Sequence, residues 1–203
     1  MKVTLLAHIN SRRIVEQLSE QLTQKEILPH MSFTFAIEGI SRACSHQIVR
    51  HRAASFSQQS QRYIQVKKLS NLVVIPPNLN DAAAVEFEKI IDEVELAYLK
   101  LVDLGVPKED ARFVLPNATE TSMIMTFDGK SLMHFFGLRL CNRAQWEVKA
   151  LAEIMLEQVK KVEPELFRSA GPYCVQRTSC PEGRFSCGKI TEIRKKYLQE
   201  NLI

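Results

Sequence analysis

Residues Arg50 to Tyr63 read RHRAASFSQQSQRY, and this stretch guides the interpretation of the whole chain. Two Arg and one His come first, small hydroxyl and amide side chains follow, and Arg62 comes near the end without any intervening acid. Guanidinium groups offer paired N–H donors on a fixed plane, and Ser and Gln add neutral donors. The stretch is therefore poor material for a core and favours a phosphate-binding surface.

The acid-free zone extends well beyond this stretch. Residues Gly39 to Asn80 contain no Asp or Glu, where the average composition would place about five. The zone also contains the cationic or titratable residues Arg42, His46, Lys67 and Lys68. The positive electrostatic field of this segment predicts an anionic ligand.

The bulk composition is that of an ordinary globular protein. A chain of 203 residues, 45% hydrophobic and 25% charged, predicts a single domain with one core. No apolar run approaches the ~20 residues that span a bilayer, and no cleavable leader is evident, so we expect a cytoplasmic protein without a membrane partner. The net charge of +4 is concentrated in one zone, so we expect no nucleic-acid partner.

The five cysteines do not predict a disulfide framework or a metal site. Their number is odd, and no CxxC pair occurs among Cys44, Cys141, Cys174, Cys180 and Cys187. We expect reduced structural thiols and no bound metal. The sequence assigns no role to the last three cysteines.

Hydrophobic periodicity predicts separated strands and long helices, an α+β fold. The expected strands are a first one around Val3 to Ala7, one over Phe33 to Ile37 ended by Gly39, and one over Thr121 to Phe127 followed by a turn at Asp128-Gly129. A first helix is expected after Ser11, with Ile14, Leu18 and Leu22 on one face, and a second over Ile40 to Val49. The clearest helix is expected to start at Asn80-Asp81 and to end before Gly105, and a short helical turn is expected over Lys108 to Phe113. Two more helices are expected over Ser131 to Leu138 and Asn142 to Val162, and residues Gly171 to Gly188 are expected to be irregular.

Several common catalytic signatures are absent from the sequence. Neither a nucleotide-binding glycine loop nor HExxH nor a GxSxG elbow occurs. Ser60 is therefore interpreted as a hydrogen-bond donor rather than a nucleophile.

Arg50-His51-Arg52, followed by seven residues and then Ser60, resembles the signature of the flavin-dependent thymidylate synthases. Three further segments, in the right order, are similar to the same family: Ser32 to Gln47, Ala111 to Thr121 and Leu132 to Glu147. The likeness covers roughly Met31 to Gly188. One short pattern would be weak evidence, but four ordered segments are specific.

This resemblance implies an architecture and an activity. The implied fold is a single α+β domain with a curved, mostly antiparallel sheet flanked by helices, assembled as a homotetramer with active sites at subunit interfaces. The implied reaction methylates dUMP to dTMP, with methylenetetrahydrofolate as carbon donor and FAD with NADPH as the source of reducing equivalents. Reduced flavin delivers a hydride in such enzymes, so no enzyme Cys attacks the pyrimidine.

The resemblance also implies roles for individual residues. Arg139 would be catalytic, facing the uracil and stabilising the anion formed when the ring N–H is lost. The substrate-binding residues would be Gln47, Arg50, Gln58, Gln59, Ser60, Arg62, Arg112 and Arg139. The cofactor-binding residues would be His30, Arg50, His51, Arg52, Gln58, Asp128 and His134.

Plainer interpretations stand beside these roles. Arg62 would be a solvated surface residue, His51 a hydrogen-bonded structural residue, His134 part of a core helix, and Arg112 a partner for Glu109 or Asp110. Two segments depart from the family pattern: the region before His30 is shortened, and Asp128 replaces the usual Asn.

Two other functions stay open at the level of sequence. An enzyme with the same chemistry would act on UMP or another pyrimidine nucleotide. The ribose hydroxyl that distinguishes UMP from dUMP is recognised by local contacts in the pocket, which the motifs do not reveal. A non-catalytic protein would bind nucleotides or single-stranded RNA through the Arg-rich zone, although only Phe56 and Tyr63 are available there for base stacking.

Overall fold

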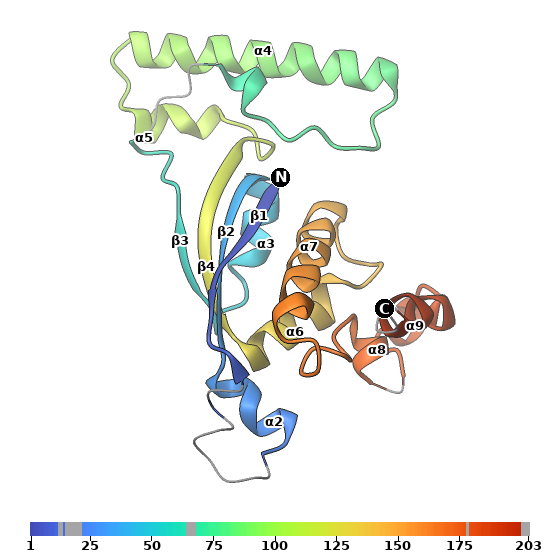
Figure 1. Ribbon diagram of the computed structural model, residues 1–203. Helices are drawn as coiled ribbons and strands as arrows, with labels where there is room; N and C mark the ends of the chain where they lie inside the picture. Colours follow the sequence, from blue (N-terminus) through green and yellow to red (C-terminus); the bar gives the residue numbers. More distant parts are fainter. Residues whose placement is uncertain (12–13, 15–21, 64–67, 178, 200–203) are drawn as a thin grey trace. The chain divides into compact units, whose positions relative to one another are not determined.

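The computed structural model describes residues 1–11, 14, 22–63, 68–177 and 179–199 (Figure 1). Its strands are β1 (Lys2–His8), β2 (Ser32–Ser41), β3 (Ser55–Gln58) and β4 (Glu120–Asp128). Its α-helices are α2 (Gln24–Ile27), α3 (Arg42–Ile48), α4 (Asp81–Asp103), α5 (Lys108–Ala111), α6 (Gly129–Arg139), α7 (Trp146–Val162), α8 (Tyr173–Gln176) and α9 (Ile190–Gln199). Short 3-10 turns occupy Leu28–His30, Leu69–Asn71, Arg112–Val114 and Gly183–Phe185.

The strands form one open antiparallel sheet in the order β1-β2-β4-β3. Alternate side chains of the two inner strands are buried, including Phe33 and Phe35 on β2 and Met125 and Phe127 on β4. An alternation of period two places these side chains on one face of the sheet. Both the α+β class and the antiparallel sheet flanked by helices are therefore confirmed.

The described chain divides into two compact units, which are considered separately. The first unit contains residues 1–37, 47–56 and 124–203, and the second contains residues 38–46 and 57–123. Whether the chain forms one domain stays a prediction.

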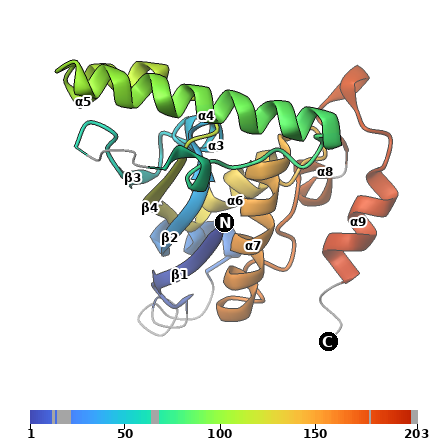
Figure 2. The same ribbon diagram turned by 90° about the horizontal axis from the view of Figure 1, so that it is seen from above.

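In the first unit, α7 packs on β1 and α6 packs on α7. Helix α7 buries Val148, Leu151 and Met155 at helical spacing. Its Gln158 carboxamide also donates to the carbonyl oxygen of Val3 at 2.8 Å, which ties the helix to the edge strand. Figure 2 shows α6 and α7 lying side by side.

In the second unit, a small core forms around α4. Ile91 and Tyr98 of this helix pack with Leu69 and Ala111, all of them buried. The Asn80 side chain caps α4 by accepting a hydrogen bond from the Ala83 N–H at 2.9 Å. The predicted start of this helix is confirmed, and so is its end, since Gly105 follows it with a φ of 84°.

The structure corrects several local predictions. Gly39 does not end its strand: β2 continues to Ser41 because Gly39 accommodates a φ of 70° within the strand. Asp128-Gly129 is not a turn, because β4 runs directly into α6 with Asp128 as the N-cap. Helix α7 begins at Trp146 rather than Asn142.

Other predictions are confirmed, incomplete or beyond the described chain. The first strand, the strand of β4 and the helical turn after Lys108 are confirmed. The segment expected to be irregular contains α8 and one 3-10 turn. The helix expected after Ser11 falls largely outside the described residues.

Two further observations concern the whole described chain. All five cysteines are free thiols. Among the helices that the structure describes, none has the length and apolar character needed to cross a bilayer.

Candidate active site

Arg139, the last residue of α6, is fixed by two hydrogen bonds. Its Nε donates to Nε2 of His51, and its Nη2 donates to the backbone carbonyl oxygen of Gln47, both at 2.9 Å. Both partners belong to the first unit, like Arg139 itself. Two anchors hold the planar guanidinium group in one orientation, as a preorganised electrostatic site requires.

His51 is the buried partner in this arrangement, with 8% of its surface exposed. Burial, and then electrostatic interactions with Arg139 and His134, lower the pKa of His51 from 6.5 to about 4. The ring is therefore neutral at pH 7. Because an Arg side chain can only donate, Nε2 of His51 accepts, and the ring proton resides on Nδ1.

These residues border a hollow of about 240 Å³ in the first unit. Arg50 and Arg52 are exposed beside it, and neither forms an ion pair with any residue in the described part of the chain. The lining consists of Arg50, His51, Arg52, Ala53, Phe127, Ser131, His134, Leu138 and Arg139. A concave surface with exposed guanidinium groups and no acid in its lining is suited to a bound anion.

A second hollow, of about 260 Å³, lies in the second unit around the loop after β3. Gln59 and Ser60 line it together with Arg42, whose Nη2 donates to the carbonyl oxygen of Gln59 at 2.9 Å. The Nε of Arg42 is buried and has no hydrogen-bond partner among the residues that the structure describes. Burial, and then the charge of Arg112, lower the pKa of Arg42, so two guanidinium groups repel one another here. Glu120 is the acid of this lining.

Gln58 precedes this loop and has a structural role. Its carboxamide nitrogen donates to the hydroxyl oxygens of Ser45 at 2.9 Å and of Thr121 at 3.2 Å. These bonds tie the end of β3 to α3 and β4 within the second unit. The carboxamide oxygen remains the acceptor available for other interactions.

Arg62 and Arg112 share Glu109 in an unexpected way. Arg62 donates to the Glu109 carboxylate at 2.7 Å, whereas Arg112 Nε donates to the backbone carbonyl oxygen of Glu109 at 2.9 Å. The plainer interpretation of Arg112, a local ion pair with Glu109 or Asp110, is wrong among the described residues, because its side chain folds back to a backbone carbonyl of the preceding helical turn. The Arg62–Glu109 pair is half exposed and contributes only ~0–1 kcal/mol to stability.

His134, His30 and Asp128 have different surroundings. His134 is exposed on α6, and its Nδ1 shares a hydrogen bond with the Tyr173 hydroxyl. His30 is exposed at the end of a 3-10 turn and lines neither of these hollows. The Asp128 carboxylate caps α6, accepting hydrogen bonds from the Ser131 N–H at 2.8 Å and the Ser131 hydroxyl at 2.6 Å.

The structure thus groups most of the predicted residues in two places. The first unit brings together Gln47 (through its carbonyl), Arg50, His51, Arg52, His134 and Arg139. The second unit brings Gln59 and Ser60 to one hollow and holds Gln58, Arg62 and Arg112 through the contacts described above. Sequence reasoning missed Tyr173, for which no spacing or motif gave a signal, and gave Arg42 no specific role although the acid-free zone includes it.

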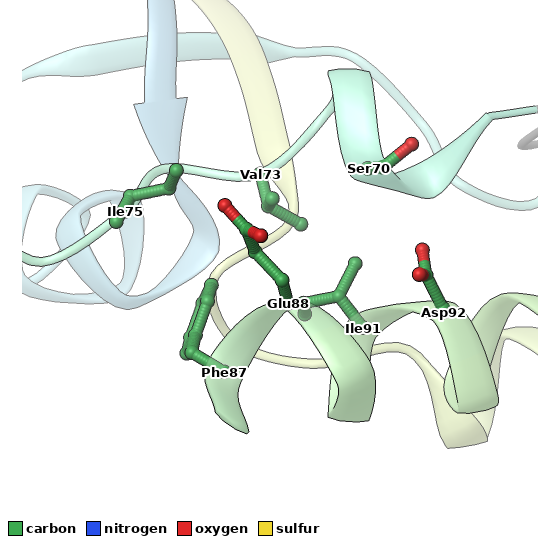
Figure 3. Close-up of a pocket in the computed structure, with 7 residues that line it drawn as sticks. All are labelled: Ser70, Val73, Ile75, Phe87, Glu88, Ile91 and Asp92. Carbon is green, nitrogen blue, oxygen red and sulfur yellow. The ribbon is translucent and has the colours of Figure 1, made fainter. Parts of the chain in front are cut away.

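A third hollow, of about 240 Å³, involves none of the predicted residues (Figure 3). Figure 3 shows the carboxylates of Glu88 and Asp92 rising from α4 among apolar side chains. Its lining is Ser70, Val73, Ile75, Phe87, Glu88, Ile91 and Asp92. Two carboxylates one helical turn apart disfavour an anionic ligand at this place.

Hollows lined by guanidinium groups in an α+β protein are suited to anionic ligands, and comparison with known proteins specifies the family. Residues 5–165 match the family described as thymidylate synthase complementing protein. The flavin-dependent thymidylate synthase of Geobacter sulfurreducens is 50% identical over 183 residues, covering 89% of this chain and 78% of that protein. The enzyme of the same name from Clostridium tetani is 40% identical over 218 aligned positions, covering 91% and 86%. The chain therefore belongs to the flavin-dependent thymidylate synthase family.

A solved structure supports the fold. The crystal structure of Thymidylate Synthase X from Helicobacter pylori with FAD and dUMP matches with a TM-score of 0.67 and covers 82% of this chain and 97% of that chain. The two sequences are 19% identical over the match, so this likeness concerns the fold alone.

Proposed function

We propose that this protein methylates dUMP to dTMP, taking the carbon from methylenetetrahydrofolate and the reducing equivalents from NADPH through FAD. The observation that carries the proposal is the fixed guanidinium group of Arg139, hydrogen-bonded to neutral His51 and to the Gln47 carbonyl. Family membership and the cationic hollows agree with it.

Arg139 is the proposed catalytic residue. Its guanidinium group stays protonated, and its two hydrogen bonds to His51 and to the Gln47 carbonyl hold it in one orientation. A uracil ring that loses its N–H proton would place such an anion next to it. Preorganisation lets Arg139 stabilise this anion without rearrangement.

The hollow beside Arg139 fits the proposed cofactor. Its exposed Arg50 and Arg52 would hold the pyrophosphate of FAD, and the apolar Phe127 and Leu138 would contact its non-polar parts. His51 and His134 add polar groups to the same lining. When bound, FAD supplies the hydride chemistry that no side chain here can supply.

The second hollow fits a nucleotide phosphate. Arg42, Gln59 and Ser60 line it, so that one guanidinium group and two neutral side chains face the hollow. Arg62 and Arg112 are the proposed further phosphate ligands, and Arg62 would exchange its weak contact with Glu109 for the phosphate.

We also propose that the active enzyme is a cytoplasmic homotetramer with sites shared between subunits.

The test is the visible absorption spectrum of the purified protein during titration with FAD, followed by dUMP or UMP in parallel samples. We expect perturbed flavin bands that respond to dUMP, and dTMP formation once NADPH and methylenetetrahydrofolate are added. A response to UMP alone would replace the substrate and keep the reaction class. Nucleotide binding without any flavin binding would exclude the proposed enzyme activity.

A further inference from the structure

Tyr173, the first residue of α8, contacts the proposed cofactor site without lining it. Its hydroxyl shares a hydrogen bond with Nδ1 of His134, and His134 lines the hollow beside Arg50 and Arg52. The two ring centroids lie 5.9 Å apart at an interplanar angle of 53°. All of these residues belong to the first unit.

The Tyr173 ring is held by its neighbours. The Arg177 guanidinium carbon lies 4.1 Å from the ring centroid, a cation–π contact. The ring also passes close to buried Gly137 of α6, where a Cβ would come within 2.6 Å of Tyr173 Cε1. Gly137 lies three residues after His134, so the missing side chain opens a slot on α6 near the imidazole.

Helix α8 is itself anchored on both sides. The Gln176 carboxamide donates to the carbonyl oxygens of Met133 at 2.8 Å and of Gly171 at 2.7 Å, which ties α8 to the turn of α6 that carries His134. Arg194 of α9 donates to the carbonyl oxygens of Cys174 at 2.9 Å and of Arg177 at 2.7 Å. The Tyr173 hydroxyl therefore has a fixed position relative to α6.

We infer that Tyr173 is a positioning residue: its hydroxyl donates to Nδ1 of His134 and so selects the tautomer that has its proton on Nε2. The protonation of one imidazole nitrogen is set by the hydrogen bond that the other makes. A proton on Nε2 gives His134 a donor for an anionic ligand in a hollow already lined by Arg50 and Arg52. This inference rests on the proposed function, in which that ligand is FAD.

The experiment compares Tyr173→Phe with a matched control, Tyr197→Phe. Both variants remove one hydroxyl from the same region, but the Tyr197 hydroxyl donates to Glu153 Oε1 at 3.1 Å and has no role in the inference. The ¹⁵N chemical shifts of the His134 ring report its tautomer, and a His134→Gln variant identifies the signals among the five His of the chain. The dissociation constant of FAD is measured on the same proteins.

In Tyr173→Phe we expect the His134 signals to move toward a mixture of tautomers and the dissociation constant of FAD to rise roughly 2- to 13-fold, as for the loss of one neutral hydrogen bond. Tyr197→Phe leaves both unchanged. Unmoved His134 signals, or moved signals with unchanged FAD affinity, would overturn the inference. If the wild-type protein bound no flavin, the proposed function would fall, whereas the His134 shifts would still decide whether Tyr173 sets the tautomer.

Discussion

Arg139 gains its proposed catalytic value from the way that it is held. Its two hydrogen-bond acceptors are the neutral ring of His51 and the Gln47 carbonyl, and neither of them is an anion. Both anchors accept hydrogen bonds from nitrogens of one plane, so charge and geometry are coupled in this residue. A substitution that keeps the charge but loses the planar group separates the two.

We expect Arg139→Ala to bind dUMP measurably but to lose turnover by roughly 10²–10³-fold or more, the scale for removing one preorganised donor. Arg139→Lys keeps the charge but cannot form both anchoring bonds, so we expect it to recover only a small part of the rate. Single-turnover methylation and equilibrium nucleotide binding are the two measurements. Normal turnover in Arg139→Ala would remove the catalytic role.

Arg62 gives a prediction about the phosphate site. We expect Arg62→Ala to raise the dissociation constant of dUMP more than about tenfold, because a charge-assisted hydrogen bond contributes ~1.5–3 kcal/mol. Glu109→Gln is the control, since it removes the competing partner of Arg62 and leaves the guanidinium group in place. Calorimetric titration should give equal or tighter binding in this control, and an unchanged constant in Arg62→Ala would place Arg62 outside the site.

His51 predicts a dependence of stability on pH. Its pKa is lowered from 6.5 to about 4 in the folded chain, chiefly by burial, so between these values the unfolded chain binds more protons. The corresponding stability is therefore present above pH 6.5 and is lost as the pH falls toward 4. Arg139 and His134, which also face the ring, contribute in the same direction.

Urea unfolding between pH 4.5 and 7 measures this effect. His51→Gln keeps an acceptor for Arg139 but does not titrate, so we expect a shallower loss of stability with acid in that variant. Equal slopes in the variant and the wild-type protein would show that other groups cause the acid sensitivity.

At the scale of elements, α6 carries both His134 and Arg139 and depends on a single capping side chain. Asp128 accepts two hydrogen bonds from Ser131 at the first turn of the helix. We expect Asp128→Ala to lower the free energy of unfolding by about 0.5–2 kcal/mol and Asp128→Asn to change it little, because Asn caps equally well. Urea denaturation of both variants tests the assignment, and equal losses in both would point to the charge rather than the cap.

The elements that sequence could predict are those with a strong period. The apolar spacing of α4 and the alternation of β4 are sufficient to identify them. The prediction of a turn at Asp128-Gly129 is wrong because Asp followed by Gly is found both in turns and at the start of helices. Only the hydrogen bonds from Ser131 to the Asp128 side chain distinguish the two. Gly39 misled because a glycine that usually interrupts a strand can also stay inside one with a positive φ.

At the scale of the whole molecule, the candidate site draws on segments far apart in the sequence. The composition of the stretch from Arg50 to Arg62 is sufficient to predict an anion-binding surface. The catalytic role of Arg139, in contrast, is implied only by the family resemblance. Tyr173 could not be predicted, because its partnership with His134 spans 39 residues and rests on a slot left by Gly137. Long-range contacts of this kind leave no local pattern.

The proposed sharing of sites between subunits gives a test by complementation. We expect Arg139→Ala and Arg62→Ala, each impaired alone when dUMP is below saturation, to recover part of the activity when co-expressed, because mixed oligomers would contain some sites with both arginines intact. Light scattering with tagged copies confirms that mixed oligomers form. Mixed oligomers without any recovered activity would show that one chain supplies both arginines to each site.

The direct passage from β4 into α6 has a consequence for how the chain can vary in length. Strand β4 ends at Asp128 and α6 begins at Gly129, so no loop is available to absorb an added residue. One insertion inside α6 would rotate everything after it by about 100° and advance it by about 1.5 Å, carrying Arg139 away from His51. The number of residues between the end of β4 and Arg139 is therefore fixed, and engineered tags or grafted peptides should be inserted elsewhere in the chain.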